Sequence, residues 1–464
     1  MASAIILLPF YIEFLPTPVY GELILYMGFA LLVQIFVTYS FDTSIYNYYH
    51  EFKADPGQLS VFISSVFSFV IVISLITCAV LFVFGNLIFE KLAQQASLTF
   101  YPYGALSIVT GIFQAILKIN SSLLQTQEKA GSFLFFNLLS FSLIAGLSVL
   151  GLYLFPNELV GPIVGRLVAV GISASWVLVS VYRQFGIHFE FKLIKNTFEF
   201  NHPSLLYQLM QWANLTFDRY ILAPFTDLTV VGIYDFAAKC LMAIDFLLTG
   251  FYQSFFPKVL GITALQYKKK TTVEINRYYN GLTAVTIVLV TGCIFAMPVV
   301  LQWMVNWFDK PQYLAVIQWI PYIAITYLLR SMRFYVAMPY AALKYSKPLP
   351  FFYLSIVTVK IVSMIFLIPR LGVQGVIIAT WIGYVVEIII LYYGARTKFE
   401  VQFNVFKLLI APLVIAIVIA LVEPLFGKTS PLLIHGSYIL IGLTVLVWGY
   451  RNELNLFSWN KFFK

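Results

Sequence analysis

The sequence has little charge and few of the residues that build metal sites or disulfides. Only 11% of its 464 residues are charged and 61% are hydrophobic, whereas soluble domains average about 25% charged residues. The composition therefore excludes a soluble enzyme and a disordered scaffold. The three cysteines lie in apolar runs and the four histidines show no ligand spacing, so neither a disulfide framework nor a metal site is predicted.

Long apolar runs make up most of the chain. A transmembrane helix needs about 20 apolar residues to cross about 30 Å of hydrocarbon, and the runs divide into about fourteen such segments. The chain is therefore predicted to be an all-α polytopic membrane protein. The expected spans are residues 3–17, 20–45, 60–86, 101–124, 131–154, 159–183, 203–225, 229–257, 279–306, 313–343, 349–369, 371–394, 405–424 and 431–449.

The net charge of +9 is explained by membrane topology. Short cytoplasmic connections of membrane proteins carry an excess of Lys and Arg. With both termini placed in the cytoplasm, eighteen of the 29 Lys and Arg residues fall in cytoplasmic connections. Only four fall in outward connections, namely Lys91, Lys310, Arg370 and Lys428. We therefore expect a multi-pass protein with both ends cytoplasmic and with no nucleic-acid partner.

A basic polar stretch divides the first twelve helices into two sets of six. We expect residues 1–184 to form an N-terminal lobe and residues 203–396 a C-terminal lobe, joined by a cytoplasmic linker at 185–202. Residues 397–464 then hold two extra helices and a cytoplasmic tail. The first helix is expected to be truncated, because about fourteen apolar residues before Pro16 reach only ~21 Å. Either an upstream segment is missing or this helix spans imperfectly.

Two weak sequence matches predict that the lobes are repeats. Val19–Leu23 corresponds to Val230–Tyr234 at an offset of 211, and Gly161–Gly165 corresponds to Gly375–Ala379 at an offset of 214. Copies that are six helices apart share one membrane orientation, so we expect a pseudo-two-fold axis and a cavity between the lobes. Small residues four apart can equally reflect ordinary packing of membrane helices.

Ionisable residues inside the spans are the best candidates for function. Each costs roughly 2.5–3.5 kcal/mol at a helix centre unless it is paired or hydrated. Basic residues outnumber acidic ones, which predicts a cavity with an excess of positive charge. Arg166 is near enough to the outer interface for its side chain to snorkel there. The basic residues are Lys118, Arg166, Arg219, Lys239, Arg330, Arg333 and Lys360, and the acidic ones are Asp42, Asp218, Asp235, Asp245 and Glu387.

Two arginines near mid-membrane point to phosphate. Arg330 and Arg333 lie one turn apart on the tenth span, which carries no acidic residue. Guanidinium groups bind phosphate in a bidentate way, so this pair suits an anionic substrate. Lys118 and Lys360 lie at comparable depth and are further candidates. Lys360 could instead pair with Glu387 on the next span.

A second group of charges is expected near the outer ends of the seventh and eighth spans. Asp218 and Arg219 end one span, and Asp235 and Lys239 lie four residues apart on the next, which places them on one helical face. They could contact substrate, or they could form ion pairs that hold the two helices together. Asp42, in the inner third of the second span, could join the cavity or accept hydrogen bonds at a helix end.

Three motifs carry a resemblance to a known family. They are the turn Leu15-Pro16-Thr17-Pro18-Val19-Tyr20-Gly21, the string Asp218-Arg219-Tyr220 that ends the seventh span, and the pattern Gly232-x-Tyr234-x-x-Ala237-x-Lys239 that opens the eighth. With twelve plus two helices, the chain resembles the bacterial polysaccharide (O-antigen type) flippases of the multidrug/oligosaccharidyl-lipid/polysaccharide exporter superfamily. The motifs are short, and the resemblance covers nearly the whole chain through the topology.

The resemblance implies a transporter without catalytic residues or a cofactor. Members of the family move a polyprenyl-diphosphate-linked oligosaccharide across the bacterial inner membrane by alternating access, for surface polysaccharide and lipopolysaccharide biosynthesis. The lipid bilayer and the polysaccharide polymerase machinery are the other expected partners. Arg219 and Lys239, with Asp218 as orienting partner, match the family motifs.

The remaining site residues rest on charge alone. The expected cationic cavity comprises Arg219, Lys239, Arg330, Arg333, Lys118 and Lys360, with Asp218, Asp235 and Asp42 as supporting or ion-coupling acidic residues for a coupling ion that the sequence does not identify.

Two alternatives remain open. A cation-coupled multidrug exporter of the same superfamily would need an acidic cavity, whereas these spans are net basic. A membrane glycan polymerase or ligase would be expected to carry a large outward loop with catalytic Arg or His. The outward connections are short, and His435 is the only histidine near one.

Overall fold

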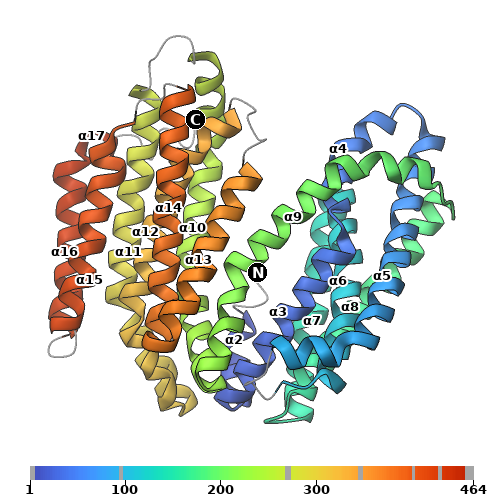
Figure 1. Cartoon of the computed structure of the whole chain (residues 1–464), viewed down its shortest axis with the longest axis horizontal. Coiled ribbons are helices and arrows are strands. Elements are labelled where there is room, and N and C mark those ends of the chain that lie inside the picture. The colour runs from blue at the N-terminus through green and yellow to red at the C-terminus, as the bar shows by residue number, and fades with distance from the viewer. Residues whose placement is uncertain are drawn as a thin grey trace. The chain divides into compact units, whose positions relative to one another are not determined.

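The computed structural model describes residues 6–92, 98–266, 273–342, 349–399, 403–426 and 431–454. Within these residues the chain is helical and contains no β-strand. The helices follow one another from blue to red in Figure 1. The predicted all-α class is therefore confirmed.

The helices of the first half precede α11. They are α2 (Leu8–Phe14), α3 (Thr17–Thr38), α4 (Phe41–Phe52), α5 (Pro56–Leu92), η1 (Phe100–Gly104), α6 (Ala105–Thr126), α7 (Ala130–Leu154), α8 (Val160–Phe185), α9 (Phe191–Leu222), η2 (Ala223–Phe225) and α10 (Leu228–Gln266).

The helices of the second half complete the described chain. They are α11 (Val273–Phe308), η3 (Pro311–Gln318), α12 (Ile320–Ala342), α13 (Leu349–Leu371), α14 (Val373–Phe399), η4 (Phe406–Ile410), α15 (Ala411–Phe426), α16 (Pro431–Gly449) and α17 (Arg451–Leu454).

About half of these helices can cross a membrane. Among the described residues, nine are long and apolar enough, and ten if η3 and α12, which are bent by 49°, count as one span. Each of the fourteen expected spans overlaps a helix. The chain is therefore a multi-pass membrane protein. The expected second span, 20–45, is divided, because Tyr39 and Ser40 adopt left-handed backbone angles with φ of 48° and 59°.

The chain divides into two compact units, Met1–Asp235 and Phe236–Lys464. The division falls inside α10, whereas the expected linker was 185–202. The second part of that linker is the beginning of α9, which starts at Phe191. The lobe boundaries inferred from sequence stay a prediction.

The helix α6 is central in the first unit. It packs against α3, α4 and α8 and, over its fully described length, exposes no large apolar side chain. In contrast, α8 exposes Val168, Ile172 and Trp176. These three residues lie on one helical face, which is the face suited to lipid.

Matched glycines of the sequence repeat occupy matched environments. A Cβ on Gly161 of α8 would lie 2.3 Å from the carbonyl oxygen of Gly151 on α7. A Cβ on Gly375 of α14 would lie 2.6 Å from the carbonyl oxygen of Leu367 on α13. In both units glycine therefore permits a close helix–helix approach that no other residue allows.

A second matched pair makes direct contact. Gly21 opens α3 and Gly232 opens α10, and a Cβ on either would lie 3.1 Å from the backbone nitrogen of the other. A Cβ on Gly21 would also lie 2.0 Å from the carbonyl oxygen of Leu228. Glycine at both positions therefore allows the beginnings of α3 and α10 to approach closely within the first unit. The repeat relation between the lobes stays a prediction.

Candidate functional site

The predicted outer group of charges is a closed network in the first unit. Arg219 Nη1 lies 2.6 Å from Asp218 Oδ1, and its Nε lies 3.3 Å from Asp235 Oδ1. Tyr20 donates to Asp235 Oδ2 at 3.0 Å, and Tyr234 donates to Asp218 Oδ2 at 2.8 Å. The arginine side chain is 11% exposed and the two aspartates are 5% exposed. We call these five residues the outer cluster.

The outer cluster joins three helices of the first unit. Asp218 and Arg219 come from α9, Asp235 from the first turns of α10, and Tyr20 from α3. Arg219 also lies over the ring of Tyr234, with Cζ 5.3 Å from the centroid. Because each carboxylate has a cationic and a phenolic partner, this arrangement is typical of a structural ion-pair network. Lys239 follows Asp235 by one turn on α10 and belongs to the second unit.

A narrow polar face runs along α6. Residues three or four apart lie above one another on a helix, so polar residues at this spacing form a stripe. The α6 stripe consists of Ser107, Thr110, Gln114, Lys118 and Ser121. A helix that is central in its unit and yet polar along one face is not built to meet lipid there.

The α6 stripe binds side chains from four other helices. Lys118 Nζ lies 3.0 Å from Asp42 Oδ2 on α4 and donates to Gln208 Oε1 on α9 at 2.9 Å. Ser121 donates to Asn137 Oδ1 on α7 at 3.3 Å. The fourth helix is α8, which Gln114 contacts. Of the predicted residues, the structure thus brings Lys118 and Asp42 together.

The second unit holds a charged cluster of four residues, Asp245, Arg330, Arg333 and Glu387. Arg330 Nη1 on α12 lies 3.1 Å from Asp245 Oδ1 on α10. Arg333 on α12 pairs through Nε with Glu387 on α14. Tyr384 lies within electrostatic range of all four charges. We call this group the α12 cluster.

The α12 cluster gives Glu387 an arginine partner that the sequence did not indicate. Glu387, which the sequence offered as a partner for Lys360, binds Arg333. Lys360 is 4% exposed on α13, and its side chain lies against Gly383 of α14, where a Cβ would be 3.3 Å away. Lys360 is therefore buried among helices of the second unit.

The ion pairs present their cationic partner to the accessible side. Side-chain exposure is 23% for Arg333 against 2% for Glu387, 25% for Arg330 against 17% for Asp245, and 34% for Lys118 against 13% for Asp42. In each pair the carboxylate is the more buried partner. A ligand that approaches these clusters meets positive charge, although each pair is neutral overall.

The arginines of the α12 cluster keep hydrogen-bond donors available. Asp245 Oδ1 forms no hydrogen bond with any described residue, even though Arg330 is within ion-pair distance. Arg333 engages Glu387 through Nε and lies over Tyr353, with Cζ 4.8 Å from the ring centroid. A guanidinium has five N–H donors. Within the described part of the chain, most donors of these two arginines are uncommitted.

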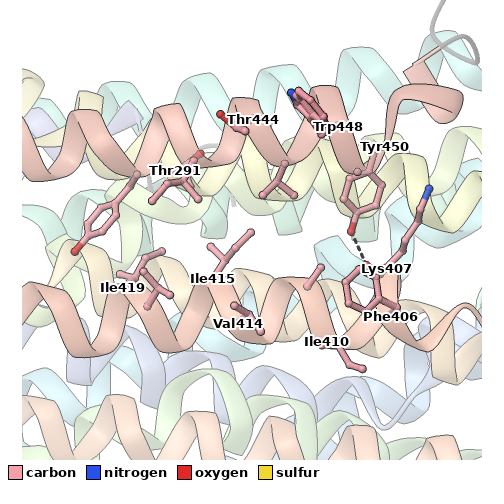
Figure 2. Close-up of a pocket in the computed structure, with 16 residues that line it drawn as sticks. Thr291, Phe406, Lys407, Ile410, Val414, Ile415, Ile419, Thr444, Trp448 and Tyr450 are labelled. Atoms are coloured by element: carbon pink, nitrogen blue, oxygen red, sulfur yellow. Dashed lines mark hydrogen bonds between the residues drawn. The ribbon is translucent and has the colours of Figure 1, made fainter.

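An apolar groove of about 430 Å³ lies between α15 and α16. Figure 2 shows Ile410, Val414, Ile415 and Ile419 on one side and Thr444 and Trp448 on the other. These two helices form a pair at one edge of the second unit (Figure 1). The volume of the groove lies within the range of small-molecule binding sites.

Polar cross-links bound the groove at both ends. At the cytoplasmic end that the topology predicts, Lys407 Nζ lies 2.9 Å from Glu453 Oε1, and Tyr450 donates to the Lys407 carbonyl oxygen at 2.5 Å (Figure 2). Burial raises the pKa of Tyr450, which keeps this phenol protonated and able to donate. At the other end His435 and Tyr438 of α16 both hydrogen-bond to Glu423 of α15, each at 3.1 Å.

Neither the α6 stripe nor the groove was predicted from the sequence. The recurrence of polar residues every three or four positions between Ser107 and Ser121 was a usable signal. The groove had no such signal, because its lining is chemically the same as any lipid-facing surface. Among the described residues, no group of His, Cys, Asp and Glu side chains could hold a metal ion.

Comparisons with known proteins agree with this architecture. The family model of the "Polysaccharide biosynthesis protein" family matches residues 2–262. The structure of the lipid II flippase MurJ in an inward closed conformation aligns with a TM-score of 0.73 at 15% identity, over 96% of each chain.

Two multidrug transporter structures also share the fold. An inward-facing transporter of the MATE family of the MOP superfamily aligns with a TM-score of 0.68 at 12% identity, over 86% of this chain and 94% of the other. An outward-facing structure of that family gives 0.52, also at 12% identity, over 86% and 92%. At these identities the likeness establishes the fold. No curated protein sequence matches the chain.

Proposed function

Because the chain belongs to the polysaccharide biosynthesis protein family, we propose that it is a flippase for polyprenyl-diphosphate-linked oligosaccharide. The proposed activity moves this lipid across the bacterial inner membrane during assembly of a surface polysaccharide. Both termini lie in the cytoplasm in this proposal, and the polymerase machinery receives the translocated product. The activity is transport by alternating access and involves no catalytic residue and no cofactor.

The α12 cluster is the observation that carries the proposal. Arg330 and Arg333 are more exposed than their carboxylate partners, and they retain uncommitted N–H donors within the described chain. Diphosphate oxygens accept such donors in a bidentate geometry. An organic cation would instead need the carboxylates on the accessible side. The cluster therefore favours an anionic lipid over a cationic drug.

The other predicted site residues have three different roles in this proposal, namely substrate contact, added positive charge and helix packing. Lys118, with Asp42 behind it, presents an exposed ammonium on the α6 stripe and would contact the phosphate or the glycan. Lys360 and Lys239 would add positive charge in the second unit. Arg219 would act with Asp218 and Asp235 to hold α9 and α10, because their mutual bonds leave few donors for substrate.

The apolar groove suits the polyprenyl chain of the same substrate. Its lining is almost wholly aliphatic and aromatic, and it lies in the two extra helices α15 and α16. Burying apolar surface from water stabilises an isoprenoid chain by about 25 cal/mol for each Å². A chain that is already in the bilayer does not gain this free energy, so only close van der Waals packing in the groove would favour its binding there. The groove would therefore orient the chain rather than supply the main affinity.

The anionic-site proposal is tested by transport in liposomes. The substrate is a fluorescent polyprenyl-diphosphate disaccharide, and the readout is the fraction that becomes accessible to an impermeant quencher. Arg330→Ala should slow translocation at least about tenfold, since a hydrogen bond to a charged group contributes about 1.5–3 kcal/mol. The double variant Arg333→Ala with Glu387→Gln should do the same without leaving a buried carboxylate unpaired.

The matched control is Lys195→Ala, which removes an exposed cation from α9. It should transport at the normal rate. Normal transport by both α12-cluster variants would reject the anionic site. Transport of a cationic dye but not of the lipid would support the multidrug alternative.

The groove is tested by filling it. Ile415→Trp should slow translocation several-fold at unchanged protein level, because the added volume occupies the groove. Ile417→Trp is the matched control, since Ile417 is on the same helix, is 54% exposed and does not line the groove. Equal rates for the two variants would contradict a role for the groove.

A further inference from the structure

An arginine that was expected to snorkel to the membrane interface is held inside the first unit. With the Gln114 amide oriented so that its oxygen faces α8, Arg166 donates to that oxygen from Nε at 2.9 Å and from Nη2 at 3.0 Å. Val168, which is exposed on α8, is two residues from Arg166 and therefore lies on the other side of the helix. Arg166 therefore points away from lipid and toward the α6 stripe.

The partner of Arg166 carries no charge. Each of the other first-unit basic residues in a span, Lys118 and Arg219, has a carboxylate at ion-pair distance. Arg166 has an amide in that place, and no carboxylate among the described residues pairs with it. The single amide oxygen accepts two N–H bonds and carries no negative charge, so a full positive charge remains at this position.

The surroundings of Arg166 contain further polar groups. Two of its five N–H donors bind Gln114, and the other three have no partner within the described chain. The Tyr11 hydroxyl on α2 is buried, lies within electrostatic range of Arg166, and is close enough to the Ser148 hydroxyl on α7 to share a hydrogen bond with it. Unused guanidinium donors beside two buried hydroxyls provide a polar setting that suits an oxyanion.

We propose that Arg166, oriented by Gln114, forms a second oxyanion site in the first unit. This inference rests on the proposed flippase function and adds a specific contact to it. The ligand is an anionic oxygen group of the substrate, which the diphosphate or an acidic sugar carboxylate could supply. The uncommitted guanidinium donors bind this group, and the neutral amide preserves the charge that attracts it.

The sharpest test changes charge while keeping shape. Gln114→Glu places a carboxylate opposite Arg166, so the guanidinium keeps its partner but the site loses its net charge. The full chain in lipid nanodiscs is titrated with farnesyl diphosphate and, separately, with glucuronate, and binding is measured by calorimetry. We expect affinity for one probe to fall about tenfold while thermal stability is retained or raised.

A matched control carries the same chemical change on the same helix. Gln125→Glu adds a carboxylate to α6 at an exposed position, and it should leave both affinities within about twofold, since exposed charges are screened. A drop for farnesyl diphosphate identifies the phosphate as the ligand, and a drop for glucuronate identifies a sugar carboxylate. A purely structural Arg166 would gain stability in Gln114→Glu and bind both probes normally, which would overturn the inference.

The test also separates this inference from the function on which it rests. If Arg330→Ala weakens farnesyl diphosphate binding and Gln114→Glu weakens neither probe, the flippase proposal stands and the second site is rejected. If the unmodified chain binds neither probe, the flippase proposal fails and the second site fails with it.

Discussion

The outer cluster and the α12 cluster are built from the same residue types, but their charged groups differ in how many hydrogen-bond and ion-pair partners they have. We call an arginine saturated when its carboxylate partners are also fully hydrogen-bonded. Arg219 has two aspartates as partners, is 11% exposed, and its carboxylates are completed by tyrosine hydroxyls. Arg330 has one aspartate, is 25% exposed, and its partner oxygen is not hydrogen-bonded within the described residues. A saturated arginine stabilises helix packing, whereas an unsaturated one is available to a ligand.

The largest expected effect is a loss of stability when the saturated arginine, Arg219, is removed. Arg219→Ala leaves Asp218 and Asp235 buried without their cation, and losing one partner of a buried pair costs about 3–5 kcal/mol. We expect low protein levels in the membrane and a reduced temperature of thermal unfolding in detergent. Arg330→Ala is the matched comparison and should lower the unfolding temperature less, because its partner Asp245 is 17% exposed and can be hydrated. Equal stabilities for the two variants would show that the clusters do not differ in this way.

A smaller loss of stability is expected when Arg219 is replaced by lysine, which keeps the positive charge. Lysine retains the positive charge but lacks the planar fork of guanidinium. Arg219→Lys cannot span Asp218 and Asp235 together, so thermal stability should fall by about 1–2 kcal/mol. Arg330→Lys should leave stability unchanged and slow translocation a few-fold, as the liposome assay measures. The reverse pattern, a stable Arg219→Lys and an unstable Arg330→Lys, would invert the assignment.

The fold was largely predictable from the sequence, because apolar length and breakers determine helices in a bilayer. All fourteen expected spans overlap observed helices. The break at Tyr39 and Ser40 was not predicted, since neither residue is a strong helix breaker and the left-handed angles depend on tertiary contacts. Ser40, for example, accepts a hydrogen bond from Gln208 of α9 at 3.1 Å.

The candidate site was predictable as a set of residues but not as a set of pairs. The charged residues in the spans were identified by their cost in a membrane. Which helix faces which was not, so neither the pairing of Asp245 with Arg330 nor that of Glu387 with Arg333 was predicted. Pairing depends on the rotation of each helix about its axis, and one sequence does not encode that rotation in a readable form. Gln114 was missed because an uncharged amide carries no comparable signal.

The groove between α15 and α16 has a consequence for the resting protein. Polar cross-links at its two ends, Lys407 with Glu453 and Glu423 with His435 and Tyr438, fix the spacing of the helices. A fixed apolar gap in a bilayer does not stay empty, since unfilled space forfeits dispersion contacts and water finds no polar partners there. An ordinary phospholipid tail should therefore occupy it between cycles, and any incoming isoprenoid must compete with the abundant acyl chains of the surrounding membrane.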